Sequence, residues 1–133
     1  MSNLQARTGE APIRVLFVED DPTVAQMYRM KLELDGYEVA VAGDGITALE
    51  TARDFQPDLL FLDIRLPKLD GMGVLEGLRA DPATEGTRVV ILSNWNEREL
   101  VERGASLGAL DHLIKSQTTP ARLSRGIAEW LAR

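Results

Sequence analysis

The sequence predicts an α/β fold in which helices cover both faces of a parallel β-sheet. Five short apolar runs alternate with longer helical patterns along the chain. Most of these runs are hydrophobic on both faces, as strands buried between two layers of helices are. With 133 residues, 44% hydrophobic and 27% charged, the chain has the size and composition of one globular domain. Strands and helices that alternate in this way form right-handed crossovers.

The five predicted strands are short, and the first begins after a polar segment. They are 13–18 (IRVLFV), 38–42 (EVAVA), 58–62 (DLLFL), 88–92 (RVVIL) and 109–114 (ALDHLI). Residues 1–12 lack the apolar centre of a signal peptide and are predicted to form a flexible tail. The folded domain is therefore expected over residues 13–133.

Five helices are predicted from capping residues and from apolar positions at helical spacing. They are expected from Asp21-Pro22 to near Asp35-Gly36, over 45–55, after LDGMG (69–73), from about Asn96, and from Thr119-Pro120. The faces predicted to be buried are, in the same order, Val24, Met27, Tyr28 and Leu32; Ile46, Leu49 and Ala52; Val74, Leu75 and Leu78; Leu100, Val101 and Leu107; and Leu123, Ile127, Trp130 and Leu131.

The composition excludes several classes of site. The chain has no cysteine, which excludes disulfides and thiolate sites, and its single histidine, His112, argues against a multi-histidine zinc site. A formal net charge of −6 gives no reason to expect direct binding to nucleic acid. The longest uncharged runs are too short to cross a membrane, so a cytoplasmic protein is expected.

Acidic residues follow two of the predicted strands at the point where each strand ends. Glu19, Asp20 and Asp21 follow the first strand, and Asp63 follows the third within PDLLFLDIRLP. Sites in open parallel sheets form at this edge, so neighbouring strands would bring these carboxylates together. Like charges that are so close repel each other unless a cation lies among them. Ligands that are all oxygen atoms suit a hard divalent ion such as Mg²⁺.

The fourth and fifth strands end on polar groups as well. RVVILS ends on Ser93, and DHLIK ends on Lys115, one of only three lysines in the chain. Four of the five strands thus deliver a functional group at the same relative position. The second strand, which is followed by Gly43-Asp44, is expected at an edge of the sheet.

The motifs together resemble those of the receiver domains of two-component response regulators, in particular the stand-alone chemotaxis regulators. They are VLFVEDDP, DGITALE, PDLLFLDIRLPKLDG, VVILS and GALDHLIKS, in this order, over roughly residues 13–132. The resemblance implies a flavodoxin-like, doubly wound sheet of five parallel strands in the order 2-1-3-4-5, with five helices.

The resemblance also implies the chemistry of the acidic residues. Asp63 would accept a phosphoryl group in a phosphorelay, and Mg²⁺ would be the cofactor. Glu19, Asp20, Asp63 and the backbone carbonyl of Arg65 would bind this ion.

Three further residues gain a role from the same resemblance. Lys115 would pair with the phosphoryl group, and Ser93 would turn its hydroxyl toward it. His112 occupies the switch position, which is usually aromatic, and would rotate inward behind Ser93. These movements would change the surface formed by the fourth helix, the fifth strand and the fifth helix.

The expected function is therefore that of a single-domain response regulator rather than an enzyme, with weak autophosphorylation and autodephosphorylation at most. A sensor histidine kinase or a histidine phosphotransfer protein would supply the phosphoryl group, and a downstream protein would be the target. One alternative is a constitutive adaptor that no longer switches. Another is a phosphatase with an aspartyl nucleophile, which would need an acid where the chain has Arg65. The oligomeric state stays open, with a dimer as one option.

Two departures from the family pattern lie close to the predicted site. The bulky pair Asn94-Trp95 follows Ser93, where the first residue is usually very small, and together with Arg65 it would crowd an attacking water. A long-lived phosphoryl state is therefore expected. Ser116 replaces the proline that usually follows the lysine, and a cis bond before serine would cost about 3–4 kcal/mol. The loop is thus either trans and rearranged, or strained.

Overall fold

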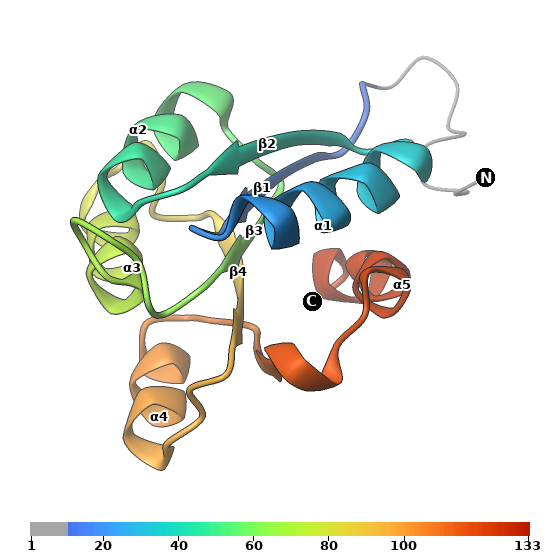
Figure 1. Cartoon of the computed structure of the whole chain (residues 1–133). Helices are drawn as coiled ribbons and strands as arrows, with labels where there is room; N and C mark the ends of the chain where they lie inside the picture. The colour runs from blue at the N-terminus through green and yellow to red at the C-terminus, as the bar shows by residue number, and fades with distance from the viewer. Residues whose placement is uncertain (1–10) are drawn as a thin grey trace.

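The computed structural model describes residues 11–133, in which five parallel strands are flanked by five α-helices (Figure 1). The strands are β1 (Arg14–Val18), β2 (Glu38–Ala42), β3 (Leu59–Leu62), β4 (Arg88–Ser93) and β5 (Asp111–Ile114). The helices are α1 (Pro22–Leu34), α2 (Gly45–Phe55), α3 (Gly71–Ala80), α4 (Arg98–Ser106) and α5 (Pro120–Leu131), with a 3₁₀ turn η1 (Lys115–Gln117) after β5. Residues 1–10, most of the predicted tail, lie outside the described residues.

The order of the strands is β2-β1-β3-β4-β5, and every pairing is parallel. This confirms the predicted fold class. The register pairs Val18 of β1 with Leu62 of β3. The next residue of each strand, Glu19 and Asp63, therefore leaves the sheet at the same edge, where the Asp63 amide donates to the Val18 carbonyl at 3.3 Å.

Two apolar layers hold the helices on the sheet. Figure 1 shows α1 and α5 on one face and α2 and α3 on the other. The first layer is rich in aromatic rings: Phe17 stacks on Tyr28 with ring centroids 4.8 Å apart, and Phe61 meets Trp130 edge-on at 5.6 Å. The second layer is mainly aliphatic and is built on β-strand residues such as Leu16, Leu60 and Leu62. Burial on both faces explains why the strands are apolar throughout.

Side-chain caps mark the starts of four helices, and those at Asp21, Asp70 and Thr119 were predicted. Asp21, Asp44, Asp70 and Thr119 each accept a hydrogen bond from a backbone amide of the first turn. The fourth helix differs, because Glu97 makes no such bond and α4 begins at Arg98 rather than near Asn96. Asn94 and Trp95, in the loop before α4, contact other elements, as described below.

Three residues predicted to be buried are exposed. Met27, Ile46 and Val101 have exposed fractions of 48%, 46% and 37%. Ala25 in α1 and Ala48 in α2 are buried instead, at 4% and 0%. The spacing of apolar residues does not determine which of two neighbouring residues faces the sheet. In both helices the small alanine side chains face it, which lets the helices approach the sheet closely.

Arg79 ties α3 to the end of α4. Its Nη1 donates to the carbonyls of Glu85 and Thr87 at 2.9 and 2.7 Å, and its Nε donates to the Leu107 carbonyl at 2.7 Å. Burial lowers the pKa of the Arg79 guanidinium. The guanidinium thus satisfies backbone acceptors in the α3–β4 loop and directly after α4.

Candidate functional site

Three carboxylates meet at the carboxyl edge of β1 and β3. One oxygen from each of Glu19, Asp20 and Asp63 lies within 4.8 Å of the other two. Glu19 and Asp63 are only 3% and 5% exposed, whereas Asp20 faces solvent. Buried carboxylates so close together need positive charge nearby.

Lys115 supplies part of that charge from the start of η1. Its Nζ lies 2.6 Å from Asp63 Oδ2 and 2.5 Å from Glu19 Oε1. Burial acts to lower the pKa of the Lys115 ammonium, but the hydrogen bonds and charges of Asp63 and Glu19 outweigh it and raise this pKa above its ordinary value. The lysine is therefore held as a cation between the two buried acids.

Glu19 is the most strongly constrained of the acids. Burial raises the pKa of Glu19, although the hydrogen bonds from Lys115 and from the Asp21 amide, at 3.0 Å, oppose this rise. Burial of Glu19 thus opposes its ionised form, and Lys115 favours it. A second cation would favour the ionised form of Glu19.

The donor set fits a magnesium ion. All three acids offer oxygen, and the cluster contains neither a sulfur nor an imidazole ligand. Hard divalent cations such as Mg²⁺ prefer these ligands. Glu19, Asp20 and Asp63 would hold the ion, while the backbone carbonyl of Arg65 as a further ligand stays a prediction.

Gly71 lets α3 begin directly against the backbone of Asp63. A Cβ at this position would lie 2.2 Å from the Asp63 carbonyl oxygen. The Gly71 amide donates to the Ile64 carbonyl at 2.7 Å, which closes the loop between β3 and α3. The sequence LDG at the start of α3 therefore helps to fix the backbone of the predicted acceptor.

The backbone of the β4–α4 loop forms hydrogen bonds with both residues of the predicted switch. Ser93 is fully buried, and its Oγ accepts a hydrogen bond from the Trp95 amide at 3.1 Å. His112 Nε2 lies 2.8 Å from the Trp95 carbonyl oxygen, so this nitrogen carries the proton. His112 Nδ1 is buried and has no hydrogen-bond partner among residues 11–133. Both predicted switch residues are thus bonded to the backbone of Trp95.

Two contacts across the loops were not foreseen from the sequence. The Arg65 guanidinium lies over the Trp95 ring, 4.0 Å from its centroid. Asn94 Oδ1 accepts a hydrogen bond from the Ser116 amide at 2.9 Å. A proline at position 116 could not donate this bond, and no peptide bond among residues 11–133 is cis. Of the two predicted arrangements the loop is therefore trans, and Asn94 and Ser116 depart from the family pattern as a pair.

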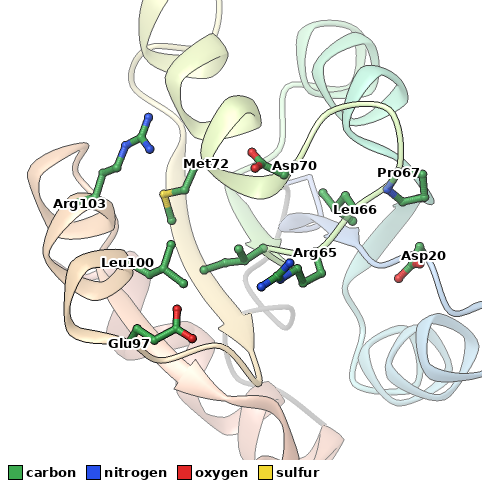
Figure 2. Close-up of a pocket in the computed structure, with 10 residues that line it drawn as sticks. Asp20, Arg65, Leu66, Pro67, Asp70, Met72, Glu97, Leu100 and Arg103 are labelled. Atoms are coloured by element: carbon green, nitrogen blue, oxygen red, sulfur yellow. The ribbon is translucent and has the colours of Figure 1, made fainter.

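A groove of about 600 Å³ extends from the acidic site along α4. Figure 2 shows Arg65 between Asp20 on one side and, on the other, Leu100 of α4 and Glu97, the residue before this helix. Its remaining lining residues are Ile64, Leu66, Pro67, Asp70, Met72 and Arg103. Arg65 is therefore placed between the predicted metal site and the switch helix.

The sequence model of the response regulator receiver domain matches residues 15–127. The chain belongs to this family. Response regulators with this domain are signalling modules of two-component systems, which fits the site of one cation and three acids described above. The family also explains the sheet order and the positions of the five helices.

Known response regulators are similar in sequence and in structure. The DNA-binding regulator RpaA from Synechocystis is 37% identical over 112 residues, which cover 84% of this chain and 46% of that protein. The chain spans less than half of the length of RpaA and of similar curated relatives. A CheY-like receiver domain protein from Methanospirillum hungatei has a TM-score of 0.83 and 25% identity, with 92% of this chain and 95% of that chain covered.

One related crystal structure holds a metal ion. It is the receiver domain of the sensor histidine kinase PA1611 from Pseudomonas aeruginosa, with a magnesium ion coordinated in its active-site cleft. Its TM-score is 0.81 at 28% identity, with 92% of this chain and all of that chain covered. Receiver domains thus bind Mg²⁺ at an acidic site, and the acidic cluster is present here.

None of the helices within residues 11–133 combines the length and the hydrophobicity that crossing a bilayer requires.

Proposed function

We propose that this receiver domain is a phosphorylation-dependent switch whose acceptor is Asp63. A sensor histidine kinase or a histidine phosphotransfer protein would supply the phosphoryl group. The observation that carries this proposal is the position of Lys115, whose ammonium contacts both Asp63 and Glu19. A carboxylate placed next to a lysine and two further acids is suited to receive a phosphoryl group rather than to cap a helix.

The chemistry is an attack by one anion on another. An Asp63 oxygen forms a bond to phosphorus, the phosphorus–nitrogen bond of the donor phosphohistidine breaks, and the donor imidazole leaves with the electron pair. Lys115 neutralises Asp63 before the reaction and can hold a phosphoryl oxygen afterwards. When bound, Mg²⁺ supplies positive charge beside the transferred group. Glu19 and Asp20 would hold it there without moving protons.

The output is a changed protein surface. A phosphoryl group adds roughly −1 to −2 charge and new acceptor oxygens beside Ser93. If the Ser93 hydroxyl turns toward them, the Trp95 amide loses its acceptor, and the loop that also bonds His112 rearranges. A cavity of about 260 Å³ between α4 and β5 is lined in part by His112 and offers space for this side chain. The affected surface would be that of α4, β5 and α5.

We propose a downstream protein as the target of this surface. The net charge of −6 argues against direct contact of this chain with nucleic acid, although relatives such as RpaA are DNA-binding regulators. In this proposal the domain is cytoplasmic, and it acts as a signalling module that does not catalyse multiple turnovers. Cell fractionation tests the compartment, and multiple turnovers on small phosphate esters would favour a phosphatase instead.

Mass spectrometry of the intact protein tests the proposal. With Mg²⁺ and a small phosphodonor such as acetyl phosphate, we expect the mass to rise by one phosphoryl group. Asp63→Asn should abolish this rise, whereas Asp54→Asn, on the exposed surface of α2, should keep it. An unchanged mass of the wild type with either acetyl phosphate or a phosphorylated histidine phosphotransfer protein would contradict phosphoryl acceptance. A rise that survives Asp63→Asn would move the acceptor to another residue.

A constitutive adaptor predicts a different result for partner binding. Binding that neither Mg²⁺ nor the phosphoryl mimic beryllofluoride changes would favour the adaptor over the switch.

A further inference from the structure

Arg65 stands beside the acceptor but is not used by the acids. Its amide lies 3.4 Å from Asp63 Oδ1, so its side chain starts within its own length of the carboxylate. Among residues 11–133, the Arg65 guanidinium forms no ion pair with a carboxylate, and its contact is the ring of Trp95. A cation is thus stored on an aromatic ring at the edge of a phosphoryl site.

The backbone of Trp95, whose ring contacts Arg65, forms hydrogen bonds with both predicted switch residues. The Trp95 amide donates to Ser93 Oγ, and the Trp95 carbonyl bonds His112 Nε2. Figure 2 shows the Arg65 side chain in the groove that leads from Asp20 to α4. The position of Arg65 is therefore linked to Ser93 and His112 through a single residue.

We propose that Arg65 is a second phosphoryl-binding cation, which leaves the Trp95 ring and donates to the phosphoryl group once Asp63 is modified. This inference rests on the function proposed above. A guanidinium binds phosphate oxygens through charge-assisted, bidentate hydrogen bonds, which are stronger than a cation–π contact with a half-exposed ring. Before phosphorylation Lys115 already pairs with Asp63, and the Arg65 guanidinium lies on the ring of Trp95.

The exchange has a direct consequence for the switch. When Arg65 leaves, the Trp95 ring loses the contact that binds it to the β3–α3 loop. The loop before α4 is then free to follow Ser93. Arg65 thus reads the phosphoryl group from the opposite side to Lys115 and passes the signal to the same loop.

Tryptophan fluorescence reports on this exchange without measuring activity. The chain has two tryptophans, and Trp130 lies in the core, 4% exposed. In a Trp130→Phe background we expect Mg²⁺ with beryllofluoride to change the Trp95 emission, and Arg65→Met to reduce this change to the part that the rearrangement of the Trp95 loop causes. Subtracting the emission of Trp95→Phe from that of the wild type gives the same Trp95 signal while Trp130 stays in the core.

Beryllofluoride affinity, measured by ¹⁹F NMR or calorimetry, provides a second readout with opposite signs. Arg65→Met should weaken binding roughly tenfold, as for one charge-assisted hydrogen bond. Arg65→Lys should recover part of this loss. Trp95→Leu should strengthen binding roughly two- to fivefold, because the ring no longer competes for the guanidinium. A merely structural role of the pair would make both substitutions weaken binding.

Arg29→Met is the matched control, because it removes the same charge from the surface of α1, where Arg29 pairs with Glu33. It should leave affinity and emission unchanged. Beryllofluoride binding without a change in Trp95 emission, or with equal affinity in Arg65→Met, would overturn this inference alone. No binding of beryllofluoride to the wild type would overturn the proposed function and this inference together.

Discussion

The buried side of the site depends on one ammonium group. Lys115 is the cation that contacts Glu19 and Asp63 at once, and both acids are almost fully buried. A buried carboxylate that loses its partner keeps its desolvation cost. The lysine therefore contributes to the stability of the unmodified protein as well as to the proposed chemistry.

Lys115→Met is expected to lower the free energy of unfolding by about 2 kcal/mol at neutral pH, because two carboxylates then face each other without a cation. Saturating Mg²⁺ should restore much of this loss. Urea unfolding with and without Mg²⁺ measures both effects. Lys31→Met, which removes a half-exposed pair with Asp35, serves as the control and should cost about 0–1 kcal/mol. Equal losses in the two variants would show that the contacts of Lys115 carry no special weight.

Asn94→Ala should shorten the lifetime of the phosphoryl group. Asn94 follows Ser93 directly and fixes the turn after Lys115 through the Ser116 amide. Its removal would open the path of the attacking water and loosen this turn. The decay of the phosphorylated protein, followed by mass, measures the rate, and Asn96→Ala nearby is the control. Unchanged or slower decay would refute the idea that Asn94 protects the phosphoryl group.

Contacts between elements place these residues with little freedom. The start of α3 packs on the backbone of Asp63 at Gly71, and α1 is joined to α5 where Ser124 donates to Asp35 at 2.5 Å. The first contact joins consecutive elements, and the second joins residues that are 89 positions apart. Each can be tested by a single small substitution.

Gly71→Ala is expected to destabilise the protein by roughly 1–3 kcal/mol, because the new Cβ would lie 2.2 Å from the Asp63 carbonyl oxygen. The backbone of α3 or of Asp63 must move to accommodate it. Gly86→Ala is the matched control, since a Cβ at that position meets nothing within 4 Å. Urea unfolding compares the two, and a Gly71 variant as stable as the Gly86 variant would contradict the close contact.

The bond between α5 and α1 should make stability depend on pH in the acid range. The Ser124 hydroxyl, followed by Lys31, holds the pKa of Asp35 below its ordinary value of 3.8. A carboxyl whose pKa is lowered by folding stabilises the fold at pH values above its ordinary pKa. This contribution is lost as pH falls through the lowered pKa.

Ser124→Ala should therefore cost roughly 1–2 kcal/mol at pH 7, and this deficit should shrink as pH falls below the ordinary value. Urea unfolding of both proteins between pH 7 and pH 3 measures the deficit. Ser106→Ala, on the exposed side of α4, should change stability by less than about 0.5 kcal/mol at every pH. A Ser124 deficit that is constant with pH would argue against a bond to the ionised carboxylate.

Across the domain as a single unit, ligand binding and folding are linked. A ligand that binds only the folded protein at 100 times its Kd adds about 2.7 kcal/mol to the free energy of unfolding. Mg²⁺ with beryllofluoride should thus stabilise the wild type, and Asp63→Asn should show no gain. Thermal or urea unfolding measures the gain, with beryllofluoride without Mg²⁺ as the control. An equal gain in Asp63→Asn would place the binding site elsewhere.

Much of this domain could be predicted from sequence, because its strands are short, apolar and separated by capped helices. The register of β1 and β3 then places Glu19 and Asp63 at one edge, and this follows from topology alone. The capping residues Asp21 and Asp70 likewise act locally and can be read from their neighbours.

The parts that were missed depend on contacts between loops. The Arg65–Trp95 stack and the Asn94–Ser116 bond join residues that are 30 and 22 positions apart, in segments without periodicity. Asn94, Trp95 and Ser116 depart from the family pattern, but the pattern does not show which residues they contact.

The three carbonyl bonds of Arg79 give α4 one anchored end. They include the carbonyl of Leu107, directly after the helix, whereas the first turn follows Glu97 and has no side-chain cap. A helix that is held mainly at one end moves by tilting about that end, so residues further from it are displaced more. If the Asn94-Trp95 loop rearranges as proposed, the uncapped first turn of α4 is therefore expected to move further than the end next to Leu107.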